Sequence, residues 1–257
     1  MEKTKGILVV SFGTSYMETL EKTIAVIEDN IQTHFPEYKV YRAFTSQMIL
    51  NKLKKRDNLH FNNVTEALEK MMEDKIERIV VQPTHILNGI ENDKMIEDIK
   101  AYEERFQKIS MGKPLLSDTD DYKKAIHALM AEVDLDHDEA LVLMGHGTDH
   151  HANAAYPTLE YTAHLLGYKQ VFVGTVEGFP DLRNAMSKLE EQRIKKVTLI
   201  PFMVVAGDHA RNDMAGDEDS WKSQLEDEGY QVRTILRGLG EMKGIQNIFV
   251  EHIEEVM

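Results

Sequence analysis

The segment Leu141-Val142-Leu143-Met144-Gly145-His146-Gly147-Thr148 sets the architecture expected for this chain, because a close counterpart opens the sequence. The counterpart is Ile7-Leu8-Val9-Val10-Ser11-Phe12-Gly13-Thr14. In each segment, a run of apolar residues typical of a fully buried strand leads into a turn that contains glycine. The Gly-Thr pairs that end the two segments align, so Phe12 lies opposite His146. The chain therefore carries an internal repeat.

A second pair of segments supports this repeat. Residues 80–89 match residues 199–207 when one residue of the first segment, before its proline, is left unpaired. The alignment then places Glu91 opposite His209. The period is about half of the chain, which indicates duplication into two similar lobes rather than a solenoid.

Short β-branched runs alternate with longer amphipathic stretches along the whole chain. This alternation predicts an α/β fold of parallel sheets flanked by helices. We expect two lobes, residues 1–135 and 136–257, divided in the acidic stretch 132–139. The helical faces are marked by Leu20, Ile24, Ile27 and Ile31 and, after a Pro-Asp start signal, by Leu182, Met186 and Leu189. The strands are expected at residues 7–10, 39–44, 79–81, 141–144, 171–173 and 197–200.

The composition of the 257 residues excludes several classes of protein. The 30 Lys and Arg residues against 44 Asp and Glu residues give a net charge of −14, so we expect no nucleic-acid partner. The chain has no cysteine, so a metal site must use His, Asp, Glu, Met or backbone oxygen. The apolar run 6–12 is too short to span a membrane and lacks a small-residue cleavage site. We therefore expect a cytoplasmic protein with no membrane partner.

Three potential metal ligands follow predicted strands of the second half, where open parallel sheets bind ligands. They are His146, Glu177 and His209. Two imidazoles and one carboxylate suit a divalent first-row metal, and either imidazole can act as a general base. Taken singly, each residue is more often an ordinary loop or helix-start residue, but all three fall at equivalent loop positions of one lobe. The first lobe holds Phe12, approximately Ser46, and Glu91 there.

Other polar residues allow more than one interpretation. His85 is either a buried, hydrogen-bonded histidine or a residue that faces the ligand. Met203 is either a core residue or a soft ligand. His150 and His151 are loop residues that face solvent, residues that cap the helix that starts near residue 152, or residues that orient His146. The basic run 52–56 is either a solvated helix end or a site for substrate carboxylates.

Several of these motifs together resemble one known family, the anaerobic-type sirohydrochlorin cobaltochelatases of vitamin B12 biosynthesis. The resemblance covers almost the whole chain. It is carried by residues 9–15, 42–46, 85–89, 144–147, 176–177 and 205–214, with Ser220-Trp221-Lys222 downstream.

The resemblance implies a class II chelatase-like fold and ATP-independent insertion of Co²⁺ into sirohydrochlorin. It implies no cofactor beyond the substrate metal Co²⁺, with Fe²⁺ and Ni²⁺ as alternative ions in vitro, and a homo-oligomer. Precorrin-2 is the alternative ring. The family's metal ligands and catalytic residues match His146, Glu177 and His209, and we expect His146 to be the principal base. The expected substrate-binding residues are Phe12, Thr14, His85 and Met203.

Two other functions fit the same residues. One is a sirohydrochlorin ferrochelatase that makes sirohaem, because the ligand set suits Fe²⁺ as well as Co²⁺. Ferrochelatases of this fold carry a glutamate at the second histidine, so His209 favours the cobalt branch. The other is a non-enzymatic protein that binds a metal or a tetrapyrrole without catalysing insertion.

Overall fold

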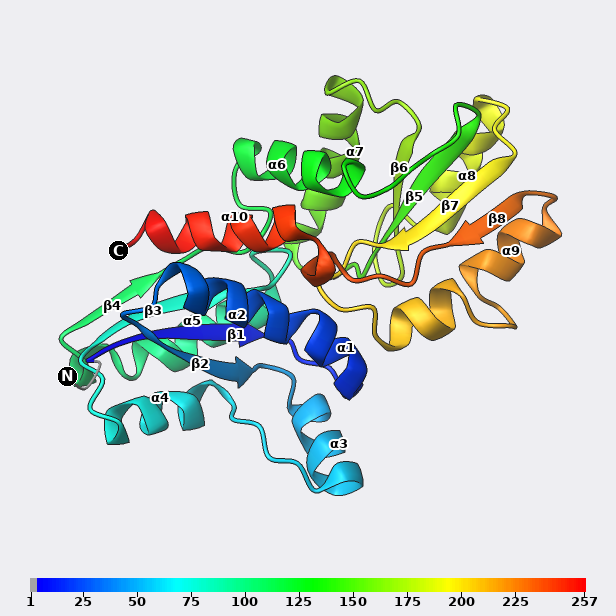
Figure 1. Cartoon of the computed structure of the whole chain (residues 1–257). Coiled ribbons are helices and arrows are strands. Elements are labelled where there is room, and N and C mark those ends of the chain that lie inside the picture. The colour runs from blue at the N-terminus through cyan, green and yellow to red at the C-terminus, as the bar shows by residue number, and fades with distance from the viewer. Residues whose placement is uncertain (1–3) are drawn as a thin grey trace. The chain divides into compact units, whose positions relative to one another are not determined.

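The chain forms two compact units, each built around one parallel sheet, in a computed structural model that describes residues 4–257 (Figure 1). The first unit comprises the residues up to Ser117 together with Ile245–Met257, and the second comprises Asp118–Gly244. Within residues 4–257, no helix is long and apolar enough to cross a lipid bilayer. The predicted α/β fold with parallel sheets is confirmed.

The sheet of the first unit has the strand order β2-β1-β3-β4, with all neighbours parallel. Its strands are β1 (Lys5–Ser11), β2 (Lys39–Phe44), β3 (Arg78–Pro83) and β4 (Lys108–Met111). The helices of this unit are α1 (Met17–Lys22), α2 (Ile24–His34), α3 (Gln47–Asp57), α4 (Val64–Glu73), α5 (Ile90–Lys100) and most of α10 (Lys243–Glu254). Apolar residues of β1, β3, α4 and α5 form a buried cluster on one side of the sheet.

The sheet of the second unit has the corresponding order β6-β5-β7-β8. Its strands are β5 (Glu139–Gly145), β6 (Val171–Thr175), β7 (Lys196–Pro201) and β8 (Gln231–Thr234). The helices are α6 (Thr119–Met130), α7 (Ala155–Leu165), α8 (Leu182–Glu191), α9 (Trp221–Asp227) and a short π-helix, η3 (His209–Met214). Asp181 caps α8 through the backbone N–H of Asn184, as the Pro-Asp start signal predicts.

The internal repeat is confirmed in the register of the two sheets. Gly13 and Gly147 both adopt positive φ angles, of 98° and 85°, at the second position after β1 and β5. This conformation favours glycine, which explains why both turns carry one. The central strands pair in equivalent registers, Val10 with Pro83 and Met144 with Pro201.

The division into units differs from the lobes expected at residues 1–135 and 136–257. Helix α6 belongs to the second unit, where it packs against α7. Residues from Ile245 onward return to the first unit, where Nδ1 of His252 bonds the carbonyl of Lys113 at 2.9 Å. The acidic stretch 132–139 ends the apolar periodicity of α6, but the change of unit lies before that helix.

Two other details differ from the sequence prediction. The apolar stripe from Leu20 to Ile31 lies on two helices, because the helix breaks at Thr23, although all its members are buried. The sequence does not predict the edge strands β4 and β8, because each has only four residues and none of them is fully buried.

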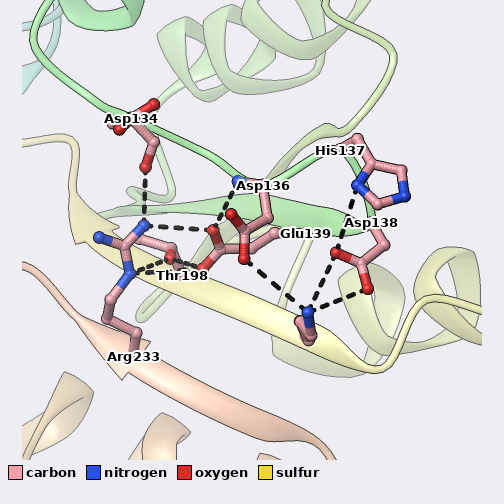
Figure 2. Close-up of polar contacts among 8 residues, drawn as sticks. Asp134, Asp136, His137, Asp138, Glu139, Thr198 and Arg233 are labelled. Carbon is pink, nitrogen blue, oxygen red and sulfur yellow. Dashed lines mark hydrogen bonds and ion pairs between the residues drawn. The ribbon is translucent and has the colours of Figure 1, made fainter.

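A polar cluster lies at the amino end of the second sheet, opposite to the end where His146 follows β5 (Figure 2). The carboxylate of Glu139 accepts hydrogen bonds from the Thr198 hydroxyl, the Asp136 backbone N–H and the Arg233 guanidinium. Arg233 also donates to the carbonyl of Asp134 at 2.8 Å. These bonds tie the acidic segment before β5 to β7 and β8.

Candidate metal centre

The three predicted ligands lie together at the carboxyl edge of the second sheet. His146 follows β5, Glu177 follows β6 and His209 begins η3 after β7. Because β6, β5 and β7 are neighbours in the sheet, their loops meet at one edge. One ligand atom from each residue lies within 4.8 Å of the others. Among residues 4–257, this is the only group of three or more His, Asp or Glu side chains with such spacing.

The two imidazoles use the same ring nitrogen in their hydrogen bonds. Nδ1 of His146 bonds the carbonyl oxygen of Gly147 at 2.9 Å, and Nδ1 of His209 bonds the carboxylate of Asp213 at 2.6 Å. Both partners can only accept, so each Nδ1 carries a proton, and Nε2 is the nitrogen that a neutral ring offers to an ion. The rings lie 4.6 Å apart at nearly a right angle. This arrangement suits two neutral imidazole ligands.

Backbone contacts fix the loops of His146 and Glu177 against each other. The N–H of Glu177 donates to the carbonyl of His146 at 2.8 Å. A Cβ at Gly147 would lie 2.6 Å from the nitrogen of Gly178, so only glycine allows the two loops to approach this closely. The carboxylate of Glu177 lies 3.8 Å from Nδ1 of His146.

The side chains beneath these loops hold them in place. Asn153 accepts from the N–H of Thr148 at 3.1 Å and donates to the carbonyl of Phe179 at 2.6 Å, so it bridges the two loops. The Tyr156 ring lies directly under Gly145, where a Cβ would come within 2.2 Å of it. Burial raises the pKa of the Tyr156 hydroxyl, which therefore stays protonated.

The three ligand side chains remain accessible to solvent, with 43%, 59% and 32% of His146, Glu177 and His209 exposed. An ion can therefore reach the site, and a bulky ligand can approach it. Two imidazoles and a carboxylate can hold a divalent first-row metal and can accept protons.

Comparison with known proteins places this chain in a family. Residues 5–257 match the family model described as "Cobalt chelatase (CbiK)". The chain is a member of the cobalt chelatase (CbiK) family. It is 38% identical to the sirohydrochlorin cobaltochelatase of Salmonella typhimurium, over 98% of this chain and 96% of that protein. It is 34% identical to the sirohydrochlorin cobaltochelatase CbiKC of Nitratidesulfovibrio vulgaris, over 97% and 89% of the two chains.

A solved structure supports the fold of this cobalt chelatase independently. SirB from Bacillus subtilis with Fe³⁺ superposes with a TM-score of 0.69 at 17% sequence identity. The match covers 98% of this chain and 95% of that chain. At this level of identity, the likeness concerns the fold.

The residues expected to bind substrate have different exposures in the cobalt chelatase. Phe12, at the carboxyl end of β1, is exposed. Thr14 and His85 are buried in the first unit, and burial lowers the pKa of His85 from 6.5 to about 4. Met203 packs in the apolar cluster of the second unit, which agrees with its interpretation as a core residue. Of the four, Phe12 alone has a side chain open to a ligand.

Contacts in the structure bear on the interpretations of the remaining polar residues. Nδ1 of His150 accepts from the N–H of Ala152, so His150 caps the short helix that follows, which is one of its three interpretations. In the basic run, Arg56 donates to the carbonyl of Ser15 and to Asp57 near the end of α3.

Sequence reasoning missed two residues that support the site, Asp213 and Asn153. The spacing of four between His209 and Asp213 was an available signal, because residues four apart in a helix share a face. Asn153 gives no such signal, since its partners lie on two loops that only the fold brings together.

Proposed function

We propose that this chelatase inserts Co²⁺ into sirohydrochlorin without ATP and without a further cofactor, in anaerobic cobalamin biosynthesis. The observation that carries the proposal is the convergence of His146, Glu177 and His209 within 4.8 Å at an open edge of the sheet. Membership of the cobalt chelatase family and the names of its relatives support the metal and the ring.

The substrate Co²⁺ binds Nε2 of His146, Nε2 of His209 and the carboxylate of Glu177. Insertion exchanges these ligands for ring nitrogens and releases two pyrrole protons, so the balanced products are the Co²⁺ complex and two protons. As the ring displaces the protein ligands, the freed imidazole of His146 takes the first proton. Its Nδ1–H stays bonded to Gly147, which leaves Nε2 as the basic nitrogen of the ring.

The macrocycle must bend to expose its nitrogen lone pairs, and contacts remote from the nitrogens can supply the energy for this strain. Of the four residues expected to bind the ring, we propose Phe12 as the direct contact, because Thr14, His85 and Met203 are buried. Phe12 is the first to test, because its aromatic face is exposed and can stack on a pyrrole ring.

The decisive experiment mixes the purified protein anaerobically with sirohydrochlorin and Co²⁺ and follows the visible spectrum. His146→Ala and His209→Ala test the site. His137→Ala is the matched control, because His137 is almost fully exposed near the amino end of the sheet. We expect conversion far above the uncatalysed rate in the wild type and the control, unchanged by ATP, and its loss in both site variants.

Other outcomes would redirect the proposal. Bound but unmetallated ring would indicate a binding protein rather than an enzyme. Conversion that survives both site substitutions would place the reaction elsewhere. Faster insertion of Fe²⁺ than of Co²⁺ under competition would indicate a ferrochelatase.

The same proposal includes three finer points: precorrin-2 as an alternative ring, association of copies into a homo-oligomer, and a cytoplasmic location. Parallel assays with the two rings test the first point. Light scattering after size-exclusion chromatography tests the second, and fractionation of the source cells tests the third.

A further inference from the structure

Asp213 makes the shortest polar contact to any of the proposed ligands. Its carboxylate accepts a hydrogen bond from Nδ1–H of His209 at 2.6 Å. The corresponding nitrogen of His146 is held by a backbone carbonyl at 2.9 Å instead. The two histidines of the site are therefore oriented by different chemistry, one by a neutral dipole and the other by a charge.

The geometry of η3 fixes this contact within one element. His209 and Asp213 are four residues apart, and so are Ala210 and Met214, which are both fully buried. The second pair anchors the π-helix in the core of the second unit, where Met214 belongs to the apolar cluster. The first pair is thereby held on the neighbouring face. π-Helices are rare and are often found at functional sites.

Asp213 is placed to act through His209 and not on the ion. Its carboxylate accepts the hydrogen bond from Nδ1. The lone pair that can bind an ion is at Nε2, on the other side of the imidazole. Accordingly, Asp213 does not belong to the group of side chains that converges with His146 and Glu177. A carboxylate that accepts from a ligating histidine fixes the ring and strengthens its lone pair as a donor.

We propose that Asp213 is a positioning residue that sets the tautomer and orientation of His209 and so determines the affinity of the site for Co²⁺. This inference rests on the proposed function, because it takes His209 as a ligand of the substrate metal. Removal of such a partner weakens metal binding by about 10–100-fold.

The test measures binding of Co²⁺ alone, without the ring, from the absorption of the bound ion. The variants are Asp213→Asn, which keeps a neutral acceptor in the same shape, Asp213→Ala, His209→Ala and the double variant of the two alanines. Glu226→Gln is the matched control, because it removes a carboxylate that pairs with Lys222 four residues away on α9. Circular dichroism verifies that each variant is folded.

We expect Kd for Co²⁺ to rise about 10–100-fold in Asp213→Ala, to rise less in Asp213→Asn, and to stay unchanged in Glu226→Gln. In the His209→Ala background, Asp213→Ala should have no further effect, because its influence passes through the imidazole. If Asp213→Ala is misfolded, the same comparison is made with Asp213→Asn.

Three results would overturn the inference. They are an unchanged Kd in both Asp213 variants, an equal loss with and without His209, and a Kd that does not respond to His209→Ala. Failure of the proposed function has a different signature, because a wild type that binds Co²⁺ through His209 and Asp213 but does not metallate sirohydrochlorin would leave this inference intact.

Discussion

The backbone N–H of Glu177 donates to the carbonyl of His146 at 2.8 Å, and the N–H of Ser46 donates to the carbonyl of Phe12 at 3.2 Å in the equivalent loops of the first unit. The two units thus share one backbone arrangement at the carboxyl edge of their sheets. At these two aligned positions the second copy has His146 and Glu177, where the first copy has Phe12 and Ser46. The two copies therefore share the loop geometry and differ in the side chains that could bind a metal.

Substitution of Gly147 by alanine should weaken Co²⁺ binding as well as lower the stability of the protein. The residue has a φ of 85°, and its Cβ would meet Gly178 at 2.6 Å. We expect a loss of about 1–3 kcal/mol in unfolding free energy and weaker binding of Co²⁺, because the loops must separate. Urea unfolding and a Co²⁺ titration measure both effects.

Gly167 provides the control, since its φ is 98° but a Cβ there meets nothing within 4 Å. Gly167→Ala should show the cost of the backbone conformation without any change in Co²⁺ affinity. Equal effects of the two substitutions on Co²⁺ binding would contradict the role assigned to Gly147.

Truncation of Phe12 should weaken binding of the ring and leave binding of the metal unchanged. Phe12 occupies the position equivalent to His146 but has no metal-binding atom, and 41% of it is exposed. Phe12→Ala should raise KM for sirohydrochlorin several-fold, because an aromatic contact is worth about 1 kcal/mol. Steady-state kinetics and the ring-free Co²⁺ titration separate the two quantities. A change in Kd for Co²⁺ with unchanged KM would refute this prediction.

Burial of His85 should make the protein less stable in mild acid. The pKa of this histidine falls from 6.5 to about 4 on folding, because burial disfavours its charged form, although the nearby Glu91 opposes the effect. Between these values the unfolded chain binds the proton and the folded chain does not. The stability that comes from keeping this imidazole neutral is therefore fully present above pH 6.5, and it is lost as the pH falls toward 4.

Linkage gives a loss of about 2 kcal/mol from this group between pH 7 and pH 5. Urea unfolding at these two pH values should show a smaller difference in His85→Asn than in the wild type. His137→Asn, at an almost fully exposed histidine, should keep the wild-type difference. If all three proteins respond equally, His85 is not the group responsible.

Loss of the Arg233 guanidinium should destabilise the second unit without touching the metal centre. Burial alone would raise the pKa of Glu139, but hydrogen bonds from Thr198, Asp136 and Arg233 outweigh it and keep the pKa below its ordinary value. Arg233→Met leaves this carboxylate without its cation. We expect a loss of about 1–3 kcal/mol, reduced from the usual value for a buried pair because Arg233 is half exposed.

The double variant Arg233→Met with Glu139→Gln should recover part of that loss, because it removes the uncompensated charge. Urea unfolding measures the cycle. Co²⁺ affinity should stay at the wild-type value in all members, since the cluster lies at the opposite end of β5. A weakened metal site would show that the two ends of the sheet are coupled.

The central strands could be predicted from sequence because they are buried on both faces and read as continuous apolar runs, as residues 141–144 do. The edge strands β4 and β8 could not, because half-exposed strands of four residues resemble loops. The unit boundary also escaped prediction. It depends on where α6 and α10 pack, and neither helix carries that information in its own periodicity.

The convergence of His146, Glu177 and His209 was predictable because each lies in the loop that follows a strand of one parallel sheet, and topology then brings these loops to one edge. The residues that support them were harder to predict. Asp213 gave one signal, its spacing of four from His209, but the π-helix that holds the pair has no simple apolar period. Asn153 gave none, because it depends on a contact between two loops.

The return of α10 to the first unit has a consequence for the order in which the chain can fold during synthesis. The second unit is a continuous insertion, Asp118–Gly244, so all of its residues are synthesised before the first unit is complete. The first unit must wait for Ile245–Met257, which follow the second unit in the chain. The unit whose synthesis begins first is therefore completed last, and the three proposed metal ligands all come from the unit that is synthesised without interruption.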